Sequence, residues 1–205
     1  MAKHPFETKY GLTSAELLDA VNARFRLKVA LEGAVAELQM GKHIERLVGS
    51  AIDRYEHHDL DSYPDFSIWI PGRDAPLLAE CKNNRESAKK GGEAYREGGK
   101  VVAYKVETQK TRAAKGDPSS RYYGFEQYHI LGVCLGKKTG DWSDFLFVRT
   151  VDLERHADHS LKLAVMQRVP LPDSADLTPW YAELGVLIAH FDDPPCRPKR
   201  STKRN

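Results

Sequence analysis

The chain has 205 residues, with 31 Lys and Arg against 29 Asp and Glu, which gives a formal net charge of +2. This length suits one domain with a buried core, and so small a net charge does not by itself indicate a polyanionic partner. The three cysteines, Cys81, Cys134 and Cys196, lack the spacing of metal ligands. They therefore argue against a zinc module and favour buried free thiols over disulfides.

The segment from Met1 to Phe6 has no apolar signal core. No stretch of the sequence is long and apolar enough to span a bilayer. We therefore expect a cytoplasmic protein with no membrane partner.

The first elements in chain order are helical. Thr13-Ser14-Ala15-Glu16 forms a capping box, and apolar residues recur at helical spacing from there to Leu38. The pattern fits one long helix or two helices broken near Gly33 or Gly41. Helical character returns from Ile44 to Tyr55, and the stretch from there to Ser62, which contains His57 and His58, is typical of a loop.

A β-hairpin follows. Residues Phe66–Ile70 and Pro76–Lys82 have strand composition, and Pro71–Asp74 between them carries turn chemistry. Because side chains alternate across a strand, Glu80 and Lys82 share one face, and Asp65 can lie beside Glu80.

This hairpin predicts a metal site. Mg²⁺ takes oxygen ligands, and Asp65 and Glu80 supply two carboxylates. The backbone carbonyl of Cys81 is the predicted third ligand, while its thiol faces the core. Lys82 would orient a water molecule and stabilise negative charge that develops on a phosphodiester. The alternative interpretation is that Asp65 caps a turn while Glu80 and Lys82 form a surface ion pair.

The pattern of Pro64, Asp65, Glu80 and Lys82 resembles the signature of the PD-(D/E)XK nuclease superfamily. The resemblance implies an α/β fold with a restriction-endonuclease-like core, in which helices flank a mixed β-sheet. It also implies Mg²⁺ as cofactor and a further acidic residue from an upstream helix. Glu32, Glu37 and Glu45 are available for that role; Glu45 is our choice and Glu37 the second.

After the hairpin, Val101–Ala114 is compatible with a helix, which would cross over to a second hairpin. Its strands are predicted at Tyr128–Leu135 and Trp142–Arg149, joined by a turn. Leu177–Phe191 has the pattern of an amphipathic closing helix. We expect a single nuclease domain over residues 1–193, and a basic, disordered tail over residues 194–205.

Lys and Arg outnumber Asp and Glu between Lys82 and Arg121, a surplus that can neutralise backbone phosphates. Arg, Lys and Gln side chains can read base edges, and hydroxyl groups can hold phosphates. A solvated helix with ordinary surface charges is the alternative. The predicted DNA-binding residues are Lys105, Thr108, Gln109, Lys110, Thr111, Arg112, Ser119, Ser120, Arg121 and Tyr122.

Together these features predict a Mg²⁺-dependent endonuclease of the type II restriction kind, which cuts double-stranded DNA at a specific site. A homodimer is expected, because a two-fold protein can place one active site on each strand of a palindrome. One alternative is a repair, recombination or phage-related nuclease of the same superfamily. The other is a DNA-binding module in which the acidic pair is structural.

Overall fold

The computed structural model describes residues 3–61, 63–86, 92–110 and 113–196. The chain forms two compact units, Met1–Val35 and Ala36–Asn205, which are described separately. Within the described ranges, no helix is both long and apolar enough to cross a membrane.

The first unit contains helices α1 (Pro5–Tyr10) and α2 (Ser14–Asn22) and the start of α3 (Phe25–Glu45). The predicted capping box is confirmed: the Thr13 hydroxyl accepts a hydrogen bond from the Glu16 backbone N–H at 3.2 Å, and the Glu16 carboxylate accepts one from the Thr13 N–H at 2.8 Å. Neither alternative holds as stated: the helix that begins at Ser14 ends at Asn22, and α3 begins at Phe25 and runs through both Gly33 and Gly41.

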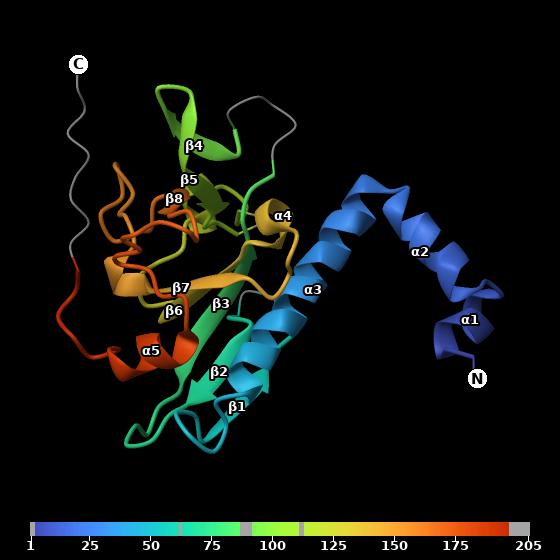
Figure 1. Ribbon diagram of the computed structural model, residues 1–205, viewed down its shortest axis with the longest axis horizontal. Coiled ribbons are helices and arrows are strands. Elements are labelled where there is room, and N and C mark those ends of the chain that lie inside the picture. Colours follow the sequence, from blue (N-terminus) through green and yellow to red (C-terminus); the bar gives the residue numbers. More distant parts are fainter. Residues whose placement is uncertain (1–2, 62, 87–91, 111–112, 197–205) are drawn as a thin grey trace. The chain divides into compact units, whose positions relative to one another are not determined.

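The second unit is built on a mixed five-stranded sheet, in the order β1-β2-β3-β6-β7 (Figure 1). β3 pairs in parallel with β6, and the other neighbouring strands are antiparallel. The prediction of an α/β fold with a mixed sheet is therefore confirmed. The strands are β1 (Arg54–His57), β2 (Phe66–Trp69), β3 (Leu77–Asn83), β6 (Ile130–Cys134) and β7 (Phe145–Arg149).

The two faces of this sheet pack against different partners. Ala79 and Cys81 of β3 lie in the cluster that includes Met40 of α3 and residues of α5 (Leu184–Ala189). The alternate residues of β6 and β7, whose side chains point to the opposite face of the sheet, pack in a second cluster with Tyr128. A Cβ on Gly132 of β6 would lie 2.8 Å from the Met40 sulfur, so glycine allows α3 to approach the sheet closely.

A second, three-stranded sheet was not predicted. Its order is β4-β5-β8, and it comprises β4 (Ala94–Glu97), β5 (Lys100–Glu107) and β8 (Met166–Val169). The predicted crossover helix at Val101–Ala114 was therefore wrong. The β-branched residues of this segment suit a strand, and pairing on both sides with β4 and β8 overrides its local helical pattern.

Two other helix predictions were too long or misplaced. The helix predicted for Ile44–Tyr55 was wrong, because α3 ends at Glu45 and Tyr55 lies in β1, paired with Ile68. His57, expected in a loop, is the last residue of β1. Of the helix predicted for Leu177–Phe191, only α5 forms, because Tyr181 pairs its backbone with Phe147 instead.

Three short helical elements connect the strands. η1 (Pro118–Arg121) lies in the crossover between the two sheets, and η2 (Thr150–Asp152) follows β7. The predicted turn between β6 and β7 contains α4 (Gly136–Thr139), which ends at Gly140 in the left-handed conformation with φ 84°.

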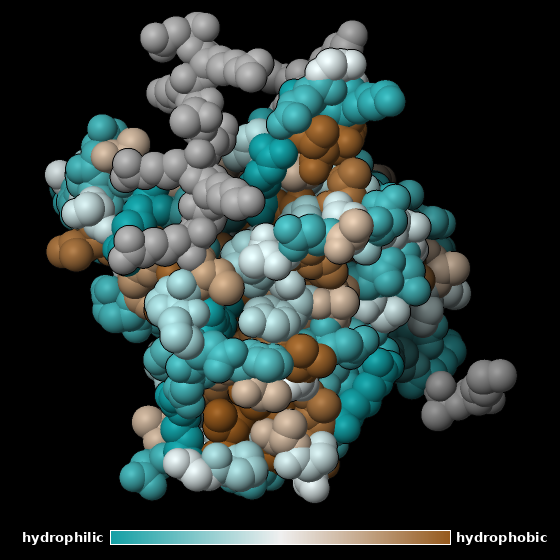
Figure 2. Space-filling view, turned by 60° about the vertical axis from the view of Figure 1, so that its left-hand side comes forward, coloured by the Kyte–Doolittle hydropathy of each residue, from teal (hydrophilic) through white to brown (hydrophobic). Residues whose placement is uncertain are grey.

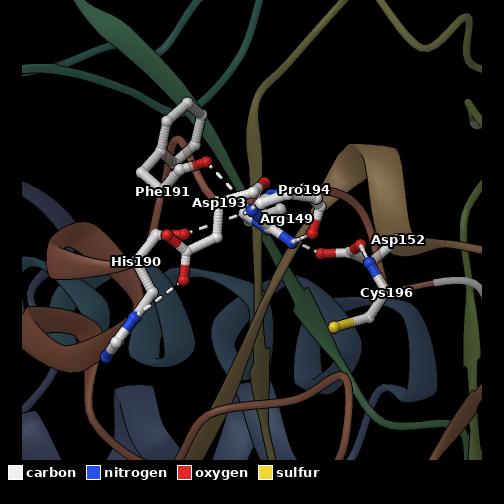
Figure 3. A network of polar contacts seen from close by, with 7 residues as sticks. All are labelled: Arg149, Asp152, His190, Phe191, Asp193, Pro194 and Cys196. Carbon is white, nitrogen blue, oxygen red and sulfur yellow. Dashed lines mark hydrogen bonds and ion pairs between the residues drawn. The ribbon is translucent and has the colours of Figure 1, made fainter.

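The buried guanidinium of Arg149, at the end of β7, fixes the segment that follows α5 (Figure 3). Its Nε donates to Asp152 Oδ2 at 2.6 Å, and its Nη1 donates to the carbonyls of Phe191 and Asp193 at 3.0 and 2.6 Å. Asp152 also accepts from the Cys196 N–H at 2.7 Å. The predicted tail thus begins with residues bonded to the domain; residues 197–205 lie outside the described part.

Hydropathy does not single out a functional region on the face drawn in Figure 2. Figure 2 shows hydrophobic residues interspersed with hydrophilic ones on one side of the molecule. Apolar surface of this kind is normal on folded proteins. The candidate site is therefore defined by polar side chains and their contacts.

Candidate active site

The register of the β2–β3 hairpin brings the predicted carboxylates together. Phe66, the first residue of β2, pairs with Ala79 of β3. Continuing this register by one residue places Asp65 opposite Glu80. Residues directly opposite each other in an antiparallel pair project to the same face. Lys82, two residues after Glu80 on β3, also projects to that face.

Asp65 is tied to the central strand through one carboxylate oxygen. Its Oδ2 accepts a hydrogen bond from the Cys81 backbone N–H at 2.7 Å. Burial, together with the negative charge of Glu80, raises the pKa of Asp65 to about 7. The two carboxylates are thus close enough for each charge to oppose the other.

Glu80 is only 4% exposed, and its carboxylate accepts more hydrogen bonds than that of Asp65. Its Oε1 accepts a hydrogen bond from the Tyr123 hydroxyl at 2.7 Å and another from the Lys82 ammonium. Within the described part of the chain, no hydrogen bond reaches Oε2 of Glu80 or Oδ1 of Asp65. Each carboxylate therefore keeps one oxygen that none of the described residues binds.

This arrangement fits a divalent cation. A cation near the two open oxygens would neutralise the repulsion that raises the pKa of Asp65, and carboxylates are ordinary Mg²⁺ ligands. The described residues contain no group of three or more His, Cys, Asp and Glu side chains placed to hold a metal ion. The ligand set would therefore be two carboxylates completed by the Cys81 carbonyl, water and substrate oxygens. The Cys81 thiol lies in the core, where burial raises its pKa.

Lys82 remains a cation in this setting. Burial alone would lower the pKa of Lys82. Glu80 and the other neighbouring groups together raise it by more than burial lowers it, so the pKa of Lys82 lies above its ordinary value. The Lys82 side chain is 26% exposed, and its ammonium pairs with Glu80. A protonated lysine can stabilise negative charge but cannot accept a proton.

Asp65→Asn is expected to stabilise the metal-free protein at about pH 8 and to leave its stability nearly unchanged at about pH 4. The pKa of Asp65 is about 7 in the folded state, above its value in the unfolded state. The folded state therefore loses stability as the pH rises from the unfolded-state pKa to the folded-state pKa. Asn removes that loss. Thermal unfolding across this pH range measures it, with Asp59→Asn on the exposed surface as control. An equal shift at both pH values would contradict the assignment.

The two glutamates considered for the upstream acidic position have different surroundings. The Tyr55 hydroxyl donates to the Glu45 carboxylate, and Glu45 is not among the main groups that shift the pKa of Asp65 or Lys82. Glu37, the second choice, pairs with His57 at 3.3 Å, and its charge adds a smaller contribution than burial and Glu80 to the raised pKa of Asp65. The structure therefore brings Glu37, and not Glu45, within electrostatic reach of the cluster.

The segment predicted to bind DNA lies on a different element than expected, and several of its polar groups are already occupied. Thr108 is fully buried and donates to the Ala164 carbonyl at 2.7 Å, so it cannot contact DNA in this structure. Gln109 donates to Glu107. The Ser119 and Ser120 hydroxyls both donate to Asp117, each at 2.6 Å. These contacts stabilise the loop itself.

Other members of the segment keep accessible groups. The Lys110 ammonium lies 5.8 Å from the centre of the Tyr123 ring, which places it beside the cluster. Arg121 donates from Nε to the Lys110 carbonyl at 3.1 Å, and Tyr122 stacks on His156 with ring centres 4.4 Å apart. The Lys105 ammonium lies 4.7 Å from the centre of the Tyr95 ring. Thr111 and Arg112 lie outside the described residues.

Sequence reasoning missed Tyr123 and Asn84. Tyr123 is far from the hairpin in the sequence, and no local pattern marks it as a partner of Glu80. Asn84 could have been found, because it directly follows β3 and continues the alternation of Glu80 and Lys82 in the sequence. Its side-chain amide is buried, and neither its nitrogen nor its oxygen has a hydrogen-bond partner among the described residues.

Comparison of this chain with protein-family models, with curated proteins and with solved structures finds no match.

Proposed function

We propose that this protein is a Mg²⁺-dependent nuclease with a PD-(D/E)XK-like site, and that it hydrolyses phosphodiester bonds in DNA. The observation that carries the proposal is the cluster of Asp65, Glu80 and Lys82, in which each carboxylate has one oxygen that no donor from the described residues reaches. The order of the sheet, with β3 between an antiparallel and a parallel neighbour, supports a restriction-endonuclease-like core.

The chain's own residues divide the chemical work. Asp65, Glu80 and the Cys81 carbonyl would hold the cation, which when bound polarises the phosphodiester and lowers the pKa of its water. Lys82, kept protonated by its neighbours, stabilises negative charge that develops on the phosphate oxygens. Glu37 replaces Glu45 in the proposal as the upstream acidic residue.

The proposed substrate is double-stranded DNA, cut at a specific site by a homodimer. The excess of Lys and Arg from Lys82 to Arg121 supports a polyanionic substrate, and the position of Lys110 beside Tyr123 extends that charge to the cluster. Incubation with a plasmid of known sequence, followed by mapping of the ends, tests the function. Unique ends support the restriction kind, scattered or structure-dependent cuts support a repair or recombination nuclease, and binding without cuts in Mg²⁺ refutes the nuclease.

Mn²⁺ is expected to support cleavage, whereas Ca²⁺ is expected to permit DNA binding and suppress cleavage. Ca²⁺ accepts more ligands at longer distances and activates its water less than Mg²⁺ does. Parallel gel-shift and plasmid-cleavage assays in the three ions, with an excess-chelator control, measure the difference. Full cleavage in the chelator control, or equal rates in Ca²⁺ and Mg²⁺, would rule out the metal-dependent reaction.

A further inference from the structure

Tyr123, which lies outside the predicted motif, is bonded directly to one of the two carboxylates. Its hydroxyl donates to Oε1 of Glu80 at 2.7 Å, the same oxygen that accepts from Lys82. Both donors therefore lie on one side of the carboxylate. Among the described residues, both hydrogen bonds to the Glu80 carboxylate therefore reach Oε1, and none reaches Oε2.

The surroundings of Tyr123 hold its ring in place. The ring packs edge-on against Tyr128, with centres 5.2 Å apart and planes at 80°. Its backbone carbonyl accepts from the Leu163 N–H at 2.8 Å. The ammonium groups of Lys82 and Lys110 each lie 5.8 Å from the ring centre. The hydroxyl thus approaches Glu80 from a fixed direction.

We propose that Tyr123 is a positioning residue that orients Glu80, so that Oε2 faces a divalent cation held with Asp65. This inference rests on the proposed function, because it assigns a role at the same site. Groups that hydrogen-bond to metal ligands fix the orientation of those ligands, and their loss typically lowers metal affinity about 10- to 100-fold. Without the hydroxyl, Lys82 alone would hold Oε1, and the carboxylate could rotate about its terminal bond.

The test is the Tyr123→Phe variant, which keeps the ring and removes only the hydroxyl. Tyr128→Phe is the matched control, because it removes a buried tyrosine hydroxyl that has no hydrogen-bond partner among the described residues. Calorimetric titration with Mn²⁺ in the absence of DNA reads out metal binding. The Mn²⁺ concentration for half-maximal plasmid cleavage gives a second readout, and circular dichroism checks that each variant is folded.

We expect Tyr123→Phe to bind Mn²⁺ about 10-fold or more weakly than the unsubstituted protein, with cleavage largely restored at saturating Mn²⁺. Tyr128→Phe is expected to bind Mn²⁺ normally. Unchanged Mn²⁺ affinity in a folded Tyr123→Phe protein, or an equal loss in Tyr128→Phe, would overturn the inference. So would a loss of cleavage that saturating Mn²⁺ does not restore.

These outcomes separate the inference from the proposed function. If the protein cuts DNA and Tyr123→Phe binds Mn²⁺ normally, the nuclease stands and the positioning role fails. If the protein binds Mn²⁺, the binding weakens in Tyr123→Phe and no DNA is cut, the positioning role stands and the nuclease fails. Absence of Mn²⁺ binding in the unsubstituted protein would overturn the inference.

Discussion

Lys82→Met is expected to lower the rate of plasmid cleavage by about 1,000-fold, in line with the loss of one group that stabilises a transition state. The substitution keeps much of the aliphatic side chain but removes the charge closest to Glu80. Because Lys82 is not a predicted metal ligand, DNA binding in Ca²⁺ should persist. Lys100→Met, which removes an exposed lysine at the start of β5, serves as control. Near-normal cleavage by Lys82→Met would contradict the proposed role.

Glu80→Gln separates charge from hydrogen bonding at the same position. The amide keeps an oxygen that can accept from Tyr123 and Lys82, but it removes the negative charge that would bind the cation. We expect cleavage and Mn²⁺ binding to be lost together. A variant that lost cleavage but bound Mn²⁺ normally would remove Glu80 from the ligand set.

Arg149→Met is expected to destabilise the protein by about 3–5 kcal/mol, the usual cost of breaking a buried ion pair from one side. Asp152 would remain buried without its ion-pair partner, and the carbonyls of Phe191 and Asp193 would lose their donor. Urea unfolding followed by tryptophan fluorescence measures the change.

Arg73→Met provides the comparison for Arg149. Arg73 also pairs with a residue that follows α5, but its partner Asp192 is 79% exposed. Exposed pairs contribute about 0–1 kcal/mol, so this variant should unfold close to the unsubstituted protein. Similar effects of the two substitutions would show that burial of Arg149 is not what stabilises this segment.

The parts of the fold that the sequence predicted depend on local signals. The Pro71–Asp74 turn and the alternation around it define the hairpin without reference to distant residues. That local register brought Asp65, Glu80 and Lys82 together as expected. The capping box at Thr13 was predictable for the same reason, since all its bonds lie within one turn.

The errors concern segments whose structure is decided by distant partners. Val101–Glu107 has a sequence that either a helix or a strand can adopt, and it forms a strand by pairing with the neighbouring β4 through a turn at Gly98–Gly99 and with β8, far along the chain. Tyr55 was assigned to a helix because no local signal announces its pairing with Ile68. The choice of Glu45 over Glu37 stays a prediction, because a helical pattern alone does not show what each side chain contacts.

The parallel pairing of β3 with β6 also has a consequence for the order of folding. The hairpin can form early from neighbouring residues, but β6 reaches β3 only after the whole crossover, with both β4 and β5, has been placed. Contacts between such distant segments form slowly, because the intervening loop must first be closed. Tyr123, which donates to Glu80, lies in that same crossover. During synthesis, Asp65 and Glu80 would therefore leave the ribosome well before the candidate site can be completed. Completion would have to wait until β6 has also emerged.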